Sequence, residues 1–321
     1  METNNSSYDG LFEQVRFCPL CNAPAENSVK LYEIKQLKWN IDMLQCGNCG
    51  LTYKRHFPTS KYFTQIYSQS YNHYSIQNIE EEITLLQHRL KRIGKANGRL
   101  LDYGCGNGSF VLAALKNGWD AYGCDPYLPD VLPSEVSERC FKTDIAETIP
   151  TGIGRFACIT MWATAEHLVD SRNTFLNLFS LLENGGLFIF NSPFGNSVIA
   201  TKNGTDWHMS NIIEHLQFHT YHSVNYLSTV SDITIKSIRV CGSPYPLGRK
   251  RGIESSVSDE AHVTPPVSLS NTSNHGFANK LKNYLFEDII SKNKFRSKDL
   301  FLHLIHLLKN GDHLEVVLQK K

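Results

Sequence analysis

The fold is decided by LLDYGCGNGSF at residues 100–110. Its apolar start leads into an acid, Asp102, and glycines then fall at alternate positions, Gly104, Gly106 and Gly108. Glycine allows a positive φ and lets a ligand approach the main chain closely, and the first turn of a helix offers unpaired N–H groups. The stretch therefore predicts a strand, a tight turn and a helix start that together bind a ligand.

The spacing of the glycines indicates which ligand this is. G-x-G-x-G is one residue tighter than the dinucleotide pattern G-x-G-x-x-G, and the Gly-Lys-Ser/Thr of a phosphate loop is missing. A cofactor without phosphates is therefore favoured over a pyrophosphate. Asp102 can face a cationic amino or sulfonium group, and Asp125, in AYGCDP at residues 121–126, is placed to bind two ribose hydroxyls. This pattern indicates S-adenosylmethionine, and the stretch resembles motif I of the class I methyltransferases.

Strands and helices alternate around this turn. Apolar runs predict strands at 99–103, 120–125, 139–144, 156–162, 187–191, 232–240 and 314–319, with helices at 76–93, 110–117 and 173–182. FACITMW at 156–162 is fully apolar, as a central parallel strand must be. We therefore expect an α/β fold, with a Rossmann-like seven-stranded methyltransferase sheet, a small N-terminal zinc ribbon and a helical insertion before the last strand.

The cofactor is expected to contact the ends of the first four strands. Residues 144 and 145 lie at the end of the third strand, where the adenine edge is usually read. The full set of expected cofactor residues is Asp102, Gly104, Cys105, Gly106, Gly108, Asp125, Pro126, Asp144, Ile145 and Trp162.

Two Cys-x-x-Cys pairs precede this domain: CPLC at Cys18 and Cys21, and CGNC at Cys46 and Cys49. Residues 22–45, 24 in number, separate the pairs, and their alternation fits a β-hairpin. Two such pairs complete a tetrahedral four-sulfur Zn²⁺ site, which leaves no position for a substrate. We expect a structural zinc ribbon, because a redox pair or buried thiols would not need the duplicated geometry.

Composition limits the location and the partners. The chain has 321 residues, 41% of them hydrophobic, and a formal net charge of +1. No run approaches the roughly 20 apolar residues of a membrane span, and METNNSSYDG is polar where a signal peptide would be apolar. We expect a soluble, cytoplasmic protein without a membrane span, and the near-zero charge argues against nucleic acid as a partner.

These patterns predict a division into segments. They are a disordered N-terminus (1–16), the zinc ribbon (17–57), an aromatic arm and leading helix (58–98), the methyltransferase domain (99–241 plus 312–321) and a loop and helical insertion (242–311). The arm is either a linker or a lid that excludes water from the sulfonium. In the insertion, His303 and His306 share a helix face, which is either ordinary helix surface or a metal site.

Methyl transfer to oxygen or carbon needs aligned reactants and a base. ATAEHLVD directly follows the fourth strand and places Glu166 and His167 near the methyl group. The ordinary pKa of histidine suits a general base, so His167 is the candidate. The alternative is that the pair only caps the next helix or orients the cofactor.

The acceptor is expected to lie against the stretch after the fifth strand, which is rich in histidine and aromatic residues. Single histidines are more often structural, so each could instead belong to the core. The candidate acceptor residues are Tyr71, Asn191, Trp207, His208, His215 and His219.

The chain resembles S-adenosylmethionine methyltransferases of the ubiquinone- and sugar-methylating type that carry an N-terminal four-cysteine zinc ribbon. The resemblance covers residues 18–240 and lies in CPLC, CGNCGLTY, LLDYGCGNGSF, AEHLVD, ENGGLFIFNSP and the W…EHLxFHT stretch at 207–220. It implies that the ribbon helps form the acceptor site and that His167 is the base. The chain lacks the second C-terminal α/β domain of the similar sugar C-methyltransferases, which leaves O-methylation open.

The sequence thus predicts a methyltransferase acting on an oxygen or carbon of a sugar-containing or other small polar metabolite. An alternative is an RNA or protein methyltransferase that uses the ribbon to recognise its substrate. A third reading is a non-enzymatic interaction module on a degenerate methyltransferase scaffold, against which the intact glycines and both acids argue.

Overall fold

The computed structural model describes residues 10–71, 86, 89–91, 93–94, 96–143, 154–241 and 311–321. All of them belong to one compact unit, Met1–Gly242 together with Asn310–Lys321. Several expectations lie outside the described residues: Asp144 and Ile145, most of the leading helix, and the insertion up to residue 310 with His303 and His306.

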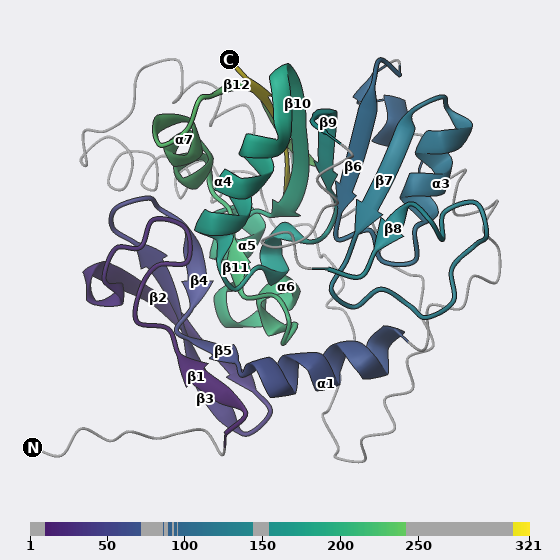
Figure 1. Cartoon of the computed structure of the whole chain (residues 1–321). Helices are drawn as coiled ribbons and strands as arrows, with labels where there is room; N and C mark the ends of the chain where they lie inside the picture. Colours follow the sequence, from purple (N-terminus) through teal and green to yellow (C-terminus); the bar gives the residue numbers. More distant parts are fainter. Residues whose placement is uncertain are drawn as a thin grey trace, which may run out of the picture. The chain divides into compact units, whose positions relative to one another are not determined.

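A seven-stranded mixed sheet forms the centre of this unit (Figure 1). Its strands, in spatial order, are β12 (Ile233–Cys241), β13 (His313–Lys320), β10 (Leu182–Pro193), β9 (Phe156–Met161), β6 (Arg99–Tyr103), β7 (Asp120–Cys124) and β8 (Cys140–Phe141). Strand β13 runs antiparallel to both of its neighbours, and the pairs from β10 to β8 are parallel. The predicted Rossmann-like methyltransferase sheet is confirmed.

Both faces of the sheet are buried. Along β6, Leu100 and Leu101 belong to two different hydrophobic clusters. Along β10, Ile189 belongs to the cluster of Leu100, and its neighbours Phe188 and Phe190 belong to that of Leu101. This alternation follows from the period of two along a strand. The described part of the leading helix contributes three buried side chains to the cluster around Leu100, namely Leu86, Leu90 and Ile93.

Helices connect the strands. α3 (Ser109–Lys116) follows β6, and Asn107 fixes its start, because Oδ1 accepts hydrogen bonds from the N–H and the hydroxyl of Ser109. Further helices in the described part of the chain include α4 (Ser171–Leu181), α5 (Val198–Asn203), α6 (His208–Asn211) and α7 (Tyr221–Thr229), with 3-10 turns η1 (Ala25–Asn27), η2 (Ala165–His167) and η3 (Gly204–Asp206).

Two predicted boundaries are wrong. The third strand is only Cys140–Phe141, because a turn of the chain carries residues 133–139 directly into it. The strand expected at 187–191 begins five residues earlier, because α4 ends at Leu181 and β10 already begins at Leu182. Residues 183–186 form an irregularity within β10, where Gly185 has a φ of +79°.

The ribbon forms a sheet that includes a strand of the methyltransferase domain. The hairpin of β2 (Ser28–Gln36) and β3 (Trp39–Cys46) continues into β4 (Thr52–Lys54), and β4 pairs with β11 (Gln217–Phe218). Figure 1 shows β11 beside β4. The predicted hairpin between the cysteine pairs is therefore present, and the ribbon is joined to the rest of the chain by main-chain hydrogen bonds.

A second connection runs through the arm. Strand β1 (Phe12–Gln14) pairs with β5 (His56–Pro58), and β5 leads into α1 (Ser60–Tyr71). Phe63 of α1 is buried against Phe57 and Leu216, in a cluster that also contacts Tyr67 and Tyr127. Phe63 and Tyr67 of the arm therefore pack between the ribbon and the methyltransferase domain.

Thr220 lies where the methyltransferase domain meets the ribbon, and its substitution tests the contribution of this contact to stability. Its Oγ1 accepts a hydrogen bond from the N–H of Ser223 and so caps α7, and its hydroxyl donates to the carbonyl of Gly50 in the ribbon, 3.0 Å away. We expect Thr220→Ala to lower the free energy of unfolding by about 1–2 kcal/mol, because both bonds are lost. Urea denaturation measures this change.

Thr220→Ser is the matched control, because both variants lose the buried methyl group and only the serine keeps the hydroxyl, so it is expected to be about 1 kcal/mol more stable than Thr220→Ala. If Thr220→Ala were as stable as the serine variant, the junction would contribute nothing to stability.

Candidate active site

The glycine turn between β6 and α3 has the backbone that its sequence predicts. Gly104, Gly106 and Gly108 have φ angles of +75°, +55° and +78°, which residues other than glycine rarely adopt. A Cβ at Gly104 would also collide with the side chain of Thr164. The turn therefore lies directly against Thr164, the residue before η2.

Asp102, at the end of β6, is 3% exposed and accepts a hydrogen bond of 2.7 Å from the hydroxyl of Thr160. Burial raises the pKa of Asp102 to about 7, and the Thr160 hydroxyl and the charge of Arg89 oppose this rise. A cation bound beside Asp102 would favour its charged form. The site therefore suits the ammonium group of an amino acid.

Asp125, the residue directly after β7, binds the main chain of the glycine turn. Its Oδ2 accepts from the N–H of Gly106 at 3.0 Å, and its Oδ1 accepts from the N–H of Tyr127 at 2.8 Å. A carboxylate has about four lone-pair sites, so ribose hydroxyls can bind in addition. Of the neighbouring expected cofactor residues, Cys105 is buried and Pro126 is exposed.

Trp162 follows β9 and is 7% exposed. Its ring packs edge-on against Phe110, with 5.8 Å between ring centroids. The guanidinium carbon of Arg89 lies 5.0 Å from the centroid of the Trp162 ring. Sequence reasoning did not anticipate the contact of Arg89 with Trp162, because nothing in the local sequence shows which ring an arginine on a helix meets.

Glu166, His167 and His215 come together although the last is far from the others in sequence. Their side-chain donor atoms all lie within 4.8 Å of one another. His167 Nε2 lies 3.9 Å from Glu166 Oε1, and the rings of His167 and His215 meet edge to face with centroids 4.9 Å apart. Nδ1 of His215 is 3.1 Å from the carbonyl of Met209. The cluster joins η2 to the loop before β11.

Burial sets the protonation of this cluster. It raises the pKa of Glu166 to about 8 and lowers the pKa of His167 to about 4, and it holds that of His215 well below the usual range. Both histidines are therefore neutral near pH 7, and Glu166 is mostly protonated. Neutral imidazoles can accept a proton from a bound acceptor.

Tyr67 of α1 is a second residue that sequence reasoning did not single out. Its hydroxyl lies 2.8 Å from Nδ1 of His167. Its ring stacks on that of Tyr127 with an interplanar angle of 8° and centroids 4.4 Å apart. Tyr67 follows Phe63 and precedes Tyr71 by one helical turn each, and this spacing could have indicated it. Tyr71 ends α1.

Asn191 and His208 lie at different edges of the predicted acceptor region. Oδ1 of Asn191 accepts from the N–H of Ala163 at 2.7 Å and supports the turn after β9, where Ala163 has a φ of +50°. The side chain of His208 is half exposed, and its Nε2 lies 3.8 Å from Oδ2 of Asp312.

Trp207 and His219 lie in the core. Neither has measurable exposure. Trp207 packs on Phe218, and the ring of His219 lies against Phe175 and Phe190 at centroid distances of 5.5 and 5.2 Å. In this packing an acceptor reaches neither side chain.

The ribbon holds the loop that carries His215. Nε2 of Gln36 donates to the carbonyl of Ile212 at 3.2 Å, and Nζ of the fully buried Lys54 donates to the same carbonyl at 2.6 Å. The main chain of Lys54 then bonds to Leu216, whose N–H donates to the carbonyl of Glu166. One continuous set of bonds therefore connects the ribbon, the loop and η2.

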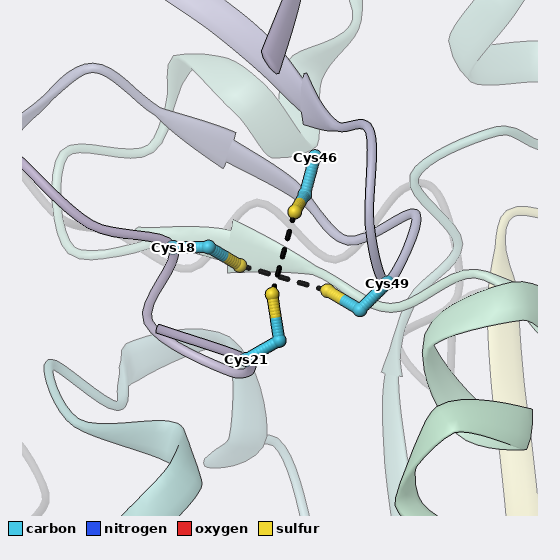
Figure 2. Close-up of side chains that lie close together, drawn as sticks. All are labelled: Cys18, Cys21, Cys46 and Cys49. Carbon is cyan, nitrogen blue, oxygen red and sulfur yellow. Dashed lines mark hydrogen bonds between the residues drawn. The ribbon is translucent and has the colours of Figure 1, made fainter. Parts of the chain in front are cut away.

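The four cysteines of the ribbon converge on one point (Figure 2). Sγ of Cys18 lies 3.6 Å from that of Cys49, and Sγ of Cys21 lies 3.5 Å from that of Cys46. The two pairs have the same backbone: the N–H of the residue after each pair donates to the carbonyl of its first cysteine at 2.9 Å. Four thiolates at this spacing fit a tetrahedral zinc ion.

The family model described as a methyltransferase domain matches residues 71–227. No curated protein matches the chain in sequence. In the described part of the chain, no helix is long and apolar enough to cross a membrane.

The chain is also similar to solved structures of methyltransferases. One is an S-adenosylmethionine-dependent methyltransferase from Archaeoglobus fulgidus (14% identity, 80% of this chain and 100% of that chain, TM-score 0.42). Another is in the complex of the Haloferax volcanii Trm112 activator with a methyltransferase (11% identity, 79% and 97%, TM-score 0.46). A third is the glycopeptide N-methyltransferase MtfA (15% identity, 52% and 90%, TM-score 0.38). These likenesses are too distant to bear on the substrate.

The sheet places a glycine turn between two buried acids at the carboxyl ends of its parallel strands, where α/β enzymes bind their cofactors. With the matched domain, this makes the chain an S-adenosylmethionine-dependent methyltransferase.

Proposed function

We propose that this enzyme transfers the methyl group of S-adenosylmethionine to an oxygen or carbon of a sugar-containing or other small polar acceptor, with His167 as general base. The observation that carries the proposal is the convergence of Glu166, His167 and His215 within 4.8 Å. The glycine turn contacts Thr164, two residues before Glu166. An acceptor bound at the cluster would have the sulfonium on one side and the base on the other.

The proposed reaction is an in-line displacement. The acceptor atom bonds to the methyl carbon, the carbon–sulfur bond breaks, and its electron pair stays on sulfur to give S-adenosylhomocysteine. The acceptor's proton passes to a base. Nδ1 of His167 is engaged by the Tyr67 hydroxyl, so Nε2 is the nitrogen proposed to take the proton. Once His167 is charged, Glu166 at 3.9 Å ionises more readily and stabilises it.

The acceptor class follows from the polar atoms of the cluster. Oε2 of Glu166 is buried and has no hydrogen-bond partner among the described residues. Buried polar atoms are almost always paired, and a hydroxyl group of the acceptor would supply the missing partner. Several polar groups in a small buried site favour a hydroxyl-rich small molecule.

An RNA or protein substrate that paired with the ribbon along β4 would need a free edge on that strand. The edge of β4 is instead paired with β11, and Gln36 and Lys54 contact the loop before it. We therefore propose that the ribbon shapes the acceptor site and does not recognise a macromolecule. A net charge of +1 also provides little attraction for nucleic acid.

Transfer of tritium from labelled S-adenosylmethionine tests the acceptor class directly. The panel comprises free sugars, nucleotide sugars, tRNA and peptides, and we expect label only in the sugar-containing molecules. Label confined to tRNA or peptide would contradict the proposal.

With that acceptor, His167→Ala is expected to lower kcat about 10²- to 10⁴-fold, because the proton acceptor is lost. The Kd of S-adenosylmethionine, measured by calorimetry, is expected to stay the same. Tyr67→Phe removes only the hydroxyl and is expected to give a smaller loss. Unchanged turnover in His167→Ala would remove this residue as the base.

The lowered pKa of His167 also predicts a pH dependence of stability. Between pH 6.5 and 4 the unfolded chain binds a proton that the folded protein excludes, so folding weakens as the pH falls through this range. From pH 7 to pH 5, protonation of His167 in the unfolded chain lowers the free energy of unfolding by about 2 kcal/mol. Urea denaturation at pH 7 and pH 5 measures this change. Between the two pH values the free energy of unfolding of His167→Gln is expected to fall by about 2 kcal/mol less than that of the unmodified protein. Equal losses in both proteins would show that His167 titrates normally.

The four cysteines are proposed to hold one structural Zn²⁺. Cys46→Ser is expected to reduce the zinc content from about one ion per chain to nearly none and to lower the Tm, because metal binding is coupled to folding of the ribbon. Elemental analysis and thermal unfolding measure both effects.

Cys241→Ser is the control, because Cys241 lies outside the four-cysteine cluster. Its zinc content should match that of the unmodified protein. Zinc retained in Cys46→Ser would contradict the proposed ligand set.

A further inference from the structure

We propose that Tyr127 is a positioning residue for methyl transfer: its ring holds Tyr67, and Tyr67 in turn holds the base His167. This inference deepens the proposed function and rests on it for the role of His167 as base.

The first support is the contact between the two tyrosine rings. The ring planes of Tyr67 and Tyr127 differ by 8°, and their centroids lie 4.4 Å apart. Stacked aromatic rings attract each other beyond the effect of the area that they bury. Both side chains are only partly buried, so dense packing on every side does not fix the Tyr67 ring. The stack therefore restrains the orientation of Tyr67.

The second support is the bond between Tyr67 and the base. The Tyr67 oxygen lies 2.8 Å from Nδ1 of His167, and the two rings meet edge-on at 74° with centroids 6.1 Å apart. A hydrogen bond weakens steeply when its length or angle departs from the optimum. The phenol oxygen lies at the far end of the Tyr67 side chain, so a small rotation of the ring would break the bond. A residue that fixes Tyr67 therefore also fixes the direction in which Nε2 of His167 points.

The third support is the place of Tyr127 in the chain. It is the second residue after Asp125, and its N–H donates to Oδ1 of Asp125 at 2.8 Å. The other oxygen of this carboxylate accepts from the N–H of Gly106 in the glycine turn. The acid expected to bind the ribose therefore also fixes the main chain of Tyr127. The stack connects this loop to α1 and so aligns the base with the methyl donor, as methyl transfer requires.

The ring of Tyr127 can be removed without detaching α1 or the loop. Phe63, one helical turn before Tyr67, is buried against Leu216 and holds α1 on the methyltransferase domain. The bond to Asp125 comes from the main chain of Tyr127, so any side chain at this position keeps it. A substitution at Tyr127 therefore tests the stack by itself.

NMR of the protein with isotopically labelled histidine tests the proposal without an acceptor. The Nδ1 resonance of His167, assigned by its absence in His167→Gln, reports the bond to Tyr67, and Tyr67→Phe gives its position when that bond is lost. We expect Tyr127→Leu to shift this resonance in the same direction and by most of the same amount. Tyr127→Phe keeps the ring and should restore the resonance. An unchanged resonance in Tyr127→Leu would overturn the proposal, even if His167→Ala retained its turnover.

Kinetics with the acceptor found by tritium transfer test the consequence for catalysis. We expect Tyr127→Leu to lower kcat about 10-fold, as the loss of one hydrogen bond in the transition state would, and to leave the acceptor KM and the Kd of S-adenosylmethionine within about twofold. The double variant Tyr127→Leu/Tyr67→Phe should be no slower than Tyr67→Phe alone, because Tyr127 acts through Tyr67.

Tyr122→Leu is the matched control, because Tyr122 is another partly buried tyrosine and its ring contacts Phe156 and Arg139. It should leave kcat and the His167 resonance unchanged. Unchanged kcat in Tyr127→Leu would show that the stack does not affect methyl transfer. Multiplied losses in the double variant would show that Tyr127 acts on another part of the site, and weaker binding of S-adenosylmethionine would show that it serves the cofactor. Each of these results overturns the proposal.

Discussion

The candidate site depends on the main-chain pairing of β4 with β11. Two residues of the methyltransferase domain complete the sheet of the ribbon, and Lys54 and Gln36 hold the loop just before them. This loop carries His215 and bonds through Leu216 to Glu166. Because main-chain bonds fix the register of a strand, the ribbon determines where one side of the site lies. In this arrangement a zinc ion remote from the chemistry would still affect catalysis, by stabilising the sheet to which the loop is attached.

The site contains buried carboxyl groups and imidazoles that destabilise the folded protein when no ligand is bound. Asp102 and Glu166 are buried carboxyl groups with raised pKa values, and His167 and His215 are buried imidazoles that burial keeps neutral. Burying such groups costs free energy unless they are paired. The cofactor's ammonium and the acceptor's hydroxyls are the partners that would offset this cost, so we interpret the cluster as built for ligands.

Local signals made the sheet and its turn predictable from sequence. Apolar runs mark the strands, alternate glycines mark a turn with positive φ, and two Cys-x-x-Cys pairs mark the four-sulfur cluster. The docking of the ribbon could not be predicted, because β4 and β11 are more than 150 residues apart in sequence and β11 has only two residues. For the same reason His219 resembled a site residue: its ring packs on Phe175 and Phe190, which come from other elements. The contacts of Arg89 with Trp162 and of Tyr67 with His167 could not be predicted, because only the fold brings these partners together.

The central claim is that the methyl donor and the cluster of Glu166, His167 and His215 face the same point. A crystal structure with bound S-adenosylhomocysteine measures this most directly. The account predicts the ribose at Asp125, the amino-acid end near Asp102, and the sulfur directed at His167 and His215 across a space that fits one acceptor group. A sulfur directed away from these histidines would contradict it.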